Sequence, residues 1–285
     1  MKKRLPTIML ILVFLTGLSL LLYPTVSDWW NSFHQSRAIA NYAHDIDELD
    51  KEAYERLLSD ARVYNEGLPE RNDRFILSEE EVREYNSLLD ISGTGIMGYI
   101  EIPEIKVSLP IYHGTRESVL SIAIGHIEGS SLPVGGESTH CVLSGHRGLP
   151  SARLFSHLDK LAEGDIFLLQ TLEETLTYEV DQIRIVEPQE IAGLAIEEGK
   201  DYCTLVTCTP YGINTHRLLV RGHRVANAEE AKIARVTSDA LQIDPMIIAP
   251  VVAVPMLLAL LILLMVKTSG KHKKNKEVDW NAHIK

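Results

Sequence analysis

Two long apolar segments, one near each end of the chain, restrict how this protein can fold. Residues 5–22 are mostly Leu, Ile, Val, Phe or Met, and residues 246–266 form a second run of this kind. Each run is long enough to cross a hydrocarbon layer of ~30 Å, which takes about 20 helical residues. We therefore predict a transmembrane helix at 245–266, and either a transmembrane helix or a cleaved signal peptide at 5–23.

Basic residues lie on the outer flank of each apolar run. Residues 2–4 are Lys-Lys-Arg, and the segment 267–285 contains several further lysines. Because basic residues favour the cytoplasmic side of a membrane, both ends of the chain are expected in the cytoplasm if the first segment is retained. The part between them, about 27–244, is then exported.

The exported part is acidic and poor in cysteine. The whole chain has a formal net charge of −11, and the part left after removing the two basic ends is more negative still. Nucleic acids are bound mainly by neutralising their phosphates, so no nucleic-acid partner is expected. Cys141, Cys203 and Cys208 are the only cysteines. This small, odd number argues against a disulfide framework and raises the question of a reactive thiol.

Hydrophobic spacing divides the exported part into a helical and a β-rich region. Apolar residues recur at three- and four-residue steps over 35–65, which predicts an amphipathic helix. Residues 66–90 are polar and read as a connector or flap, with a short helical pattern at 79–89. From Gly98 the pattern changes to short strands, which favour a sandwich or a closed barrel without choosing between them. Beyond the stretch 98–115, strands are expected at 140–144, 165–170, 175–187 (with a bulge near Asp181), 202–208 and 216–225, and short helices at 117–123 and 151–161.

Cys208 is the candidate nucleophile. It ends an apolar strand, TLVTC, and a turn-forming run, TPYGIN, follows it. The end of a strand is a place where a sheet can hold a reactive atom in position. The alternative is that Cys208 is a small buried apolar residue, as most free cysteines are. Cys203 lies five positions earlier, so the two side chains should face opposite ways in a regular strand.

Arg217 is the candidate partner of that thiol. If 204–208 and 217–221 pair as a wide hairpin, Arg217 lies across from Cys208. A guanidinium there stabilises a thiolate and can donate hydrogen bonds to an oxyanion. The alternative for Arg217 is a solvated strand residue.

A thiol nucleophile also needs a proton carrier, which is usually a histidine. His146 is best placed, in VLSGHRGLP, where an apolar strand ends in Ser-Gly. His113 and His126 lie in similar loops and are the alternatives. The chain contains no CxxC, HxxxH, HExxH, GxxxxGK[ST] or GxSxG sequence, so neither a metal nor a cofactor is expected.

The segments VLSGHRGLP and TLVTCTPYGINTHRLLVRGHR resemble the histidine and cysteine-to-arginine motifs of the sortases, which are cell-wall transpeptidases of Gram-positive bacteria. GYIEIPEIKVSLPIYHGT and HIEGSSLPVGG are similar to the pilin-polymerising class C branch. The resemblance covers about 95–225, and the two membrane segments and the N-terminal helical extension also fit class C.

This resemblance implies a mainly β fold, a closed eight-stranded sortase-type β-barrel with N-terminal helices and a membrane helix at each end. Cys208 would attack the Thr carbonyl of an LPxTG-like sorting signal, His146 would transfer protons, and Arg217 would hold the substrate and the oxyanion. Thr207 and Ser144 are predicted to contact substrate. The acceptor would be the lysine amine of a pilin or the amine of a peptidoglycan precursor, and the donors would be LPxTG-bearing pilins or surface proteins.

The chain departs from class C in one respect. Class C enzymes commonly carry a lid with an Asp-Pro-aromatic motif before the barrel, and residues 66–90 lack that motif. Asp73 and Phe75, in Asp73-Arg74-Phe75, are the nearest approximation. Either Phe75 acts as a looser plug, or the groove is open.

Three other interpretations remain. L,D-transpeptidases usually carry an SHGC-like sequence that TLVTC does not match, and papain-like proteases place Cys before His in the chain. A housekeeping sortase that anchors surface proteins to peptidoglycan is a closer alternative. A membrane-tethered scaffold, in which Cys208 is unreactive, is the non-enzymatic one.

The predicted layout follows from these observations. In chain order it is a cytoplasmic basic N-terminus (1–4), a transmembrane helix or signal peptide (5–23), an extracellular helical extension (24–65), a connector or lid (66–94), a catalytic β-barrel (95–225), a linker (226–244), a transmembrane helix (245–266) and a cytoplasmic basic tail (267–285).

Overall fold

A computed structural model of the chain describes residues 5–71 and 73–227. The predicted second membrane helix (245–266), the tail (267–285) and all but the first residues of the predicted linker (226–244) lie outside the described residues. Described residues up to Ser27 belong to one compact unit, and those from Asp28 onward belong to another.

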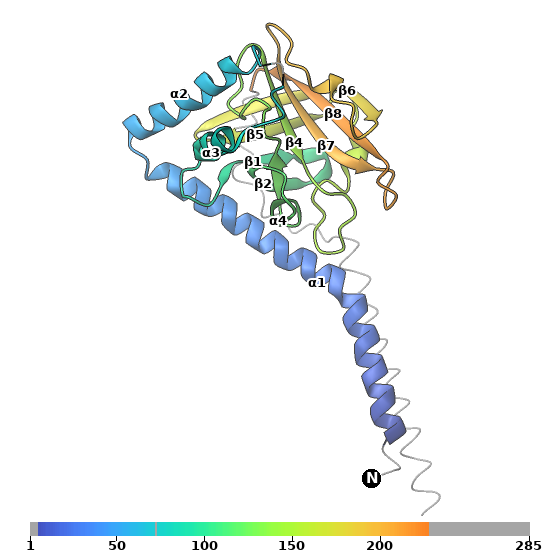
Figure 1. The fold of residues 1–285 in the computed structure, drawn as a ribbon. Helices are drawn as coiled ribbons and strands as arrows, with labels where there is room; N and C mark the ends of the chain where they lie inside the picture. The colour runs from blue at the N-terminus through green and yellow to red at the C-terminus, as the bar shows by residue number, and fades with distance from the viewer. Residues whose placement is uncertain (1–4, 72, 228–285) are drawn as a thin grey trace, which may run out of the picture. The chain divides into compact units, whose positions relative to one another are not determined.

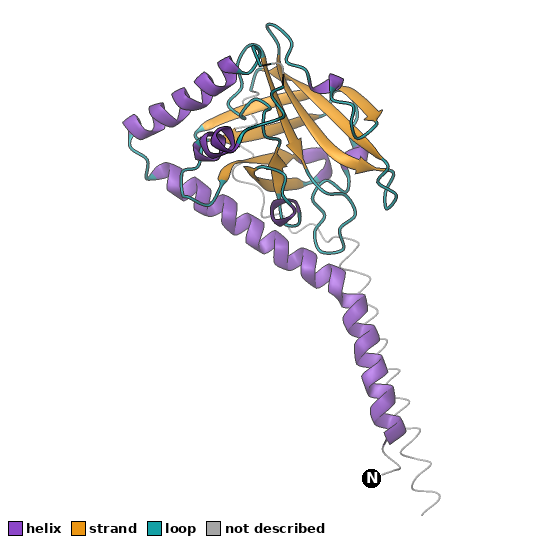
Figure 2. Cartoon of the chain, in the orientation of Figure 1, coloured by secondary structure: helices purple, strands orange, loops and turns teal. Residues whose placement is uncertain are grey.

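Eight strands close into a barrel in the second unit (Figures 1 and 2). The order around the barrel is β1-β2-β3-β4-β7-β8-β6-β5, and β5 pairs with β1 to close it. The β2/β3 and β4/β7 pairs are parallel, and the other pairs are antiparallel. This confirms the closed eight-stranded barrel. The strands are β1 (Ile96–Ile102), β2 (Val107–His113), β3 (Ile124–His126), β4 (Thr139–Ser144), β5 (Ile166–Thr171), β6 (Glu174–Val186), β7 (Asp201–Thr209) and β8 (His216–Val225).

The five strands expected from 140 onward all form within a residue or so of their predicted bounds. The predicted bulge near Asp181 is also present, because the β6/β8 register shifts between Val180 and Gln182. Strand β3 was not predicted, since three residues are too few for a periodic pattern.

The helices differ from prediction in two places. The pattern over 35–65 belongs to two helices, because Asp50 accepts a hydrogen bond from the Ala53 amide (2.7 Å) and caps a new helix. The helix expected at 151–161 is wrong: that segment forms turns and one 3-10 turn, while Phe155 donates its amide to the carbonyl of His146 (3.1 Å). The helices are α1 (Leu5–Asp47), α2 (Lys51–Gly67), α3 (Glu79–Ser87) and α4 (Glu117–Leu120), and the 3-10 turns are η1 (Pro103–Ile105), η2 (Leu158–Lys160) and η3 (Ala192–Leu194).

The apolar N-terminal part of α1 fits the prediction for residues 5–23. Among the described residues, one helix is long and apolar enough to cross a membrane, and it lies within α1 from Met9 onward.

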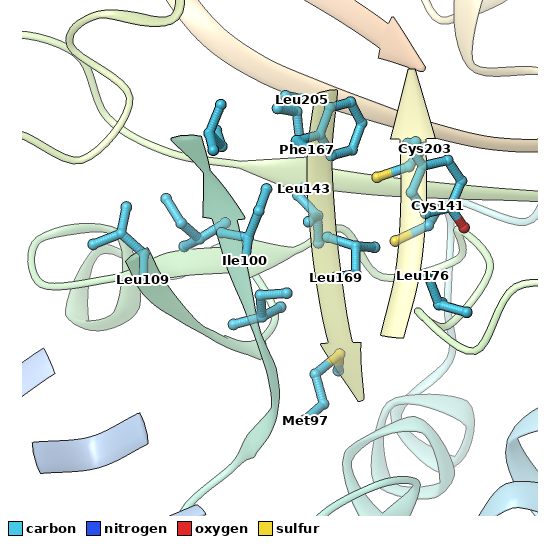
Figure 3. Packing of buried hydrophobic residues seen from close by; sticks show 14 of the residues in the cluster. Met97, Ile100, Leu109, Cys141, Leu143, Phe167, Leu169, Leu176, Cys203 and Leu205 are labelled. Carbon is cyan, nitrogen blue, oxygen red and sulfur yellow. The ribbon is translucent and has the colours of Figure 1, made fainter. Parts of the chain in front are cut away.

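The barrel interior is filled by alternate residues of its strands (Figure 3). Phe167 and Tyr178 stack with ring centroids 5.5 Å apart, and Cys141 and Cys203, paired in the β4/β7 register, are 2% and 0% exposed. Both cysteines are therefore core residues. Cys203 and Cys208 are five positions apart on β7. Because successive strand residues alternate between the two faces, their side chains lie on opposite faces of the sheet, as predicted.

Tyr42 joins α1 to the barrel. It is 2% exposed, its hydroxyl donates to the carbonyl of Met97 on β1 (3.0 Å), and the same oxygen accepts the amide of Leu172 at the β5–β6 turn (2.9 Å). One hydroxyl thus satisfies two buried backbone groups on neighbouring strands.

Replacing Tyr42 with Phe should lower the free energy of unfolding by about 1–3 kcal/mol, because both backbone groups lose their partner without access to water. Urea unfolding of the detergent-solubilised chain, followed by circular dichroism, measures this change. Tyr54→Phe on α2, where the ring is partly exposed, is the matched control and should cost less than about 0.5 kcal/mol. Equal losses in the two variants would refute this role for Tyr42.

Candidate active site

Cys208 and Arg217 lie directly opposite each other in the antiparallel β7/β8 pair. Side chains at opposed positions share a face of the sheet, with Cβ atoms about 4.5–5.5 Å apart. The predicted placement of Arg217 across from Cys208 is therefore confirmed. Cys208 is partly exposed, whereas Cys141 and Cys203 are buried. It is the thiol that a reagent in solution can reach.

His146 is brought to Cys208 by the parallel pairing of β4 with β7. Ser144 is in register with Val206, so His146 and Cys208 each lie two residues beyond a paired position. The pairing continues past the end of β4: the Gly145 amide donates to the carbonyl of Val206 (3.0 Å), and the Thr207 hydroxyl donates to the carbonyl of Gly145 (2.8 Å). These bonds hold His146 beside the end of the cysteine strand.

The loop that carries His146 is tightly packed. A Cβ atom at Gly145 would come within 2.6 Å of Ile124 and 2.7 Å of Phe155, so only glycine fits there. Arg147, whose side chain is 9% exposed, pairs with Asp159 (2.7 Å) and donates to the hydroxyl of Thr209 (3.2 Å). Thr209 follows Cys208 on β7, so Arg147 gives the His146 loop a second attachment to that strand, in addition to the hydrogen bonds of Gly145.

Glu117, at the start of α4, contacts the ring of His146. Its Oε2 lies 3.3 Å from His146 Nε2, and the Glu117 side chain is 79% exposed while that of His146 is 28% exposed. A carboxylate at this distance can accept a hydrogen bond from the ring and orient the imidazole. Sequence reasoning placed a helix at 117–123 but did not connect it to His146, since no linear spacing links positions 29 residues apart.

The two alternative histidines are structural. His126 is 0% exposed, and its ring contacts the hydroxyls of Tyr85 and Ser130 and the carbonyl of Ser131. His113 has both ring nitrogens on backbone carbonyls, those of Gly95 (2.9 Å) and Leu88 (2.7 Å). Burial lowers the pKa of His113. Neither ring has a nitrogen left for a substrate.

Arg217 keeps donors available for a substrate. Its Nη1 donates to the carbonyls of His216 (3.1 Å) and Asn214 (3.3 Å). In the described part of the chain it forms no ion pair with an acidic side chain. Its charge is therefore not neutralised there by a carboxylate.

Thr207 and Ser144 have different surroundings. Thr207 is 2% exposed and its hydroxyl is used by Gly145, so its burial favours a role in holding the histidine loop over the predicted contact with substrate. Ser144 ends β4, is partly exposed and shares the outward phase of Val142. It remains a candidate for substrate contact.

The outer face of β4, β7 and β8 carries an apolar strip that leads to Cys208. Val206 is two residues before Cys208 on β7, and Leu219 is two residues after Arg217 on β8, so both lie on the same face as the site. They pack there with Val142, Val186 and Leu194. His140 lies on the same face, and burial lowers its pKa to about 4, so the ring stays neutral between the Thr204 hydroxyl and the Ala195 carbonyl. The five apolar side chains of the strip are 0–8% exposed, so other parts of the chain cover them.

The segment Asp73-Arg74-Phe75 lies over part of this strip. Phe75 packs against the strip residues, and Arg74, 9% exposed, donates to the carbonyls of Leu194 and Gly129 and stacks on the Phe75 ring. Burial lowers the pKa of Arg74. Asp73 is exposed. The candidate lid residues therefore differ: Phe75 touches the face that bears the site, and Asp73 points to solvent.

A pocket of about 590 Å³ lies behind the site. Its lining includes Arg147, Thr209 and Leu218, the residues that follow His146, Cys208 and Arg217, together with Ile185 and Tyr211. Among the described residues, no group of three or more His, Cys, Asp or Glu side chains is arranged to hold a metal ion.

Comparisons with known proteins identify relatives of this chain. Residues 100–225 match the sortase domain family. Sortase D of Bacillus subtilis is 32% identical over 131 residues, which cover 45% of this chain and 63% of that protein. Sortase A of Streptococcus agalactiae is 32% identical over 117 residues, which cover 40% of this chain and 47% of that protein. The chain thus matches less than two thirds of the length of either relative.

Solved structures match more completely. Sortase C1 from Streptococcus agalactiae is 55% identical, with a TM-score of 0.66, and the match covers 67% of this chain and all of that one. A Streptococcus pneumoniae sortase C, whose structure is described as informative on catalysis and pilin substrate specificity, is 44% identical with a TM-score of 0.61 and is covered over 97% of its length.

Replacing Arg217 with Met should slow the alkylation of Cys208 by iodoacetamide about tenfold, because a guanidinium on the same face as a thiol raises the reactivity of the sulfur. Mass spectrometry of peptides gives the rate at each cysteine, and Cys141 and Cys203 should react only after denaturation. Arg83→Met on α3, where the side chain is 71% exposed and pairs with Glu79, removes the same charge outside the β7/β8 pair and should leave the rate unchanged. Equal rates in all three proteins would exclude this coupling.

Proposed function

Because this chain belongs to the sortase family, we propose that it is a cysteine transpeptidase that cuts an LPxTG-like sorting signal and joins the new end to an amine. The observation that carries the proposal is the junction of β4, β7 and β8. There a partly exposed Cys208 shares a face with Arg217, and β4 delivers His146 beside it.

In the first half of the reaction, the Cys208 thiolate attacks the Thr carbonyl carbon of the signal. Arg217 donates hydrogen bonds to the oxyanion of the tetrahedral intermediate. The Thr–Gly bond then breaks, His146 protonates the departing Gly amine, and a thioester remains on Cys208. Glu117, 3.3 Å from His146 Nε2, would hold the ring in position for this step.

In the second half, an acceptor amine gives a proton to His146 and attacks the thioester carbon. The Cys208 thiolate leaves, and an amide bond joins acceptor and donor. One amide is exchanged for another, so the cycle needs no cofactor.

The acceptor is best assigned to a pilin lysine. Identities of 44–55% to class C sortases over nearly the whole of their solved chains support pilin polymerisation as the role. The product would be an isopeptide bond between subunits. The alternative is transfer of surface proteins to a peptidoglycan precursor, as in a housekeeping sortase.

The enzyme is placed at the outer face of the cell membrane. The apolar helix at the start of α1 supports anchoring, and the predicted transmembrane helix at 245–266 would add a second anchor. Both ends of the chain would then be cytoplasmic, with the barrel outside the cell.

The segment 73–75 acts as a partial cover in this scheme. Phe75 occupies part of the apolar strip that a sorting signal would use, and Arg74 fastens it through the carbonyls of Leu194 and Gly129. The substrate must displace Phe75 to reach the whole strip. Asp73 has no part in this cover, because it is exposed.

The first test is mass spectrometry of the purified chain incubated with an LPxTG peptide. We expect a thioacyl adduct on Cys208 in the wild type and none in Cys208→Ala, because the thioester forms on that sulfur alone. A Lys-containing peptide should then remove the adduct as a ligated product. Absence of an adduct with the cover removed and an amine supplied would sink the transpeptidase proposal and favour the scaffold.

The proposed cover at 73–75 can be tested separately through the kinetics of a Phe75 variant. Phe75→Ala should raise kcat/KM for the sorting peptide about three- to tenfold, since the substrate no longer displaces a half-buried ring worth roughly 1 kcal/mol. Ile76→Ala is the matched control, because Ile76 is 77% exposed and packs on nothing in the strip. Unchanged kinetics in Phe75→Ala would mean that the groove is already open.

A further inference from the structure

One turn of α1 presents a large aromatic surface to solvent. Trp29, Trp30 and Phe33 are 64%, 56% and 54% exposed, and Trp29 stacks on Phe33 with ring centroids 6.4 Å apart. Exposed apolar clusters of this size usually mark an interaction surface. Neither the barrel nor the proposed reaction uses these side chains.

The opposite face of the same turn is fastened to the barrel. Successive helical residues are rotated by about 100°, which places Asp28, Asn31 and Gln35 across the helix from the aromatic side chains. Asn31 donates to the carbonyl of Ser151 (2.8 Å), Gln35 donates to that of Ile122 (2.7 Å), and Asp28 accepts the Arg153 amide (3.1 Å) and pairs with its guanidinium (3.2 Å). The orientation of the aromatic face is thus fixed relative to the barrel.

The aromatic turn also follows the apolar run closely in the sequence. About 20 helical residues span the hydrocarbon layer, so a span that begins at Leu5 ends near Pro24. Trp29 is five residues farther on, roughly 7 Å along the axis of α1. That is the level of the lipid headgroups, where tryptophan rings are enriched.

We propose that Trp29, Trp30 and Phe33 lie in the headgroup layer of the membrane and fix the orientation of the barrel on its surface. This inference rests on the proposed membrane anchoring and goes beyond it, because an anchor alone would leave the barrel free to swing. The partner surface is the phospholipid bilayer itself.

The placement of the aromatic side chains in the headgroup layer also affects the active site, through the helix face that carries Asp28, Asn31 and Gln35. Ser151 and Arg153 belong to the loop that follows His146, and Ile122 follows α4, which carries Glu117. The turn that contacts lipid therefore holds both segments that flank the His146–Glu117 pair. The bilayer supports the proton-transfer side of the site.

Tryptophan fluorescence in vesicles tests this placement. The chain has three tryptophans, so Trp280→Phe in the full chain leaves only Trp29 and Trp30 as reporters. The vesicles contain phosphatidylglycerol and a phosphatidylcholine that is brominated either near the headgroup or at the end of its acyl chains. We expect quenching by the shallow bromine to exceed quenching by the deep bromine about twofold or more.

Flotation of the same vesicles and the Cys208 adduct assay separate this inference from the proposals on which it rests. Failure to float would refute the anchoring and the seating together. Flotation without bromine quenching would overturn only the placement of the aromatic side chains in the headgroup layer. Blue-shifted tryptophan emission without quenching would assign the aromatic face to a protein partner instead. A missing adduct in quenched vesicles would count against the reaction and leave the seating in place.

A variant pair completes the test. Phe33→Ser in the Trp280→Phe chain should weaken the shallow quenching, because it removes one ring of the cluster and leaves both reporters. Val63→Ser on α2, where Val63 is 63% exposed against 54% for Phe33, is the matched control and should leave the quenching unchanged. Equal quenching in both variants would remove Phe33 from the proposed surface and contradict the inference.

Discussion

Strand β7 pairs with β4 on one side and with β8 on the other, and the candidate active site depends on those two registers. The antiparallel pairing places Arg217 opposite Cys208, and the parallel pairing delivers His146 to the same end. A shift of one residue in either register would turn a side chain to the other face. The hydrogen bonds of Gly145 with Val206 and Thr207 oppose such a shift where β4 ends in a loop, and they keep His146 beside the end of β7.

The alternation of side chains along β7 also places its two cysteines in different environments. Cys203 faces the packed interior beside Cys141, where a thiol acts as a small apolar group, and Cys208 faces outward at the strand end. The outward phase continues as the apolar strip that Phe75 partly covers. One strand thus provides core packing on one face, and the apolar strip and the partly exposed Cys208 on the other.

The N-terminal helices add a second layer of support. Tyr42 satisfies backbone groups of β1 and of the β5–β6 turn, and the turn at 28–35 holds the two segments that flank His146 and Glu117. The helix that begins as an apolar segment is therefore also a structural part of the catalytic unit.

The sequence by itself determined the strands from 140 onward, the bulge near Asp181 and the positions of Cys208, His146 and Arg217, because short periodic strands and strand-end motifs are local features. It could not choose barrel over sandwich by pattern alone, since closure depends on β5 meeting β1 across many intervening residues. Only the tertiary structure decided that 151–161 forms turns instead of a helix, that Thr207 supports Gly145, and that Glu117 contacts His146. Each of these outcomes is fixed by partners distant in the chain, whose packing overrides local propensity and leaves no linear signal.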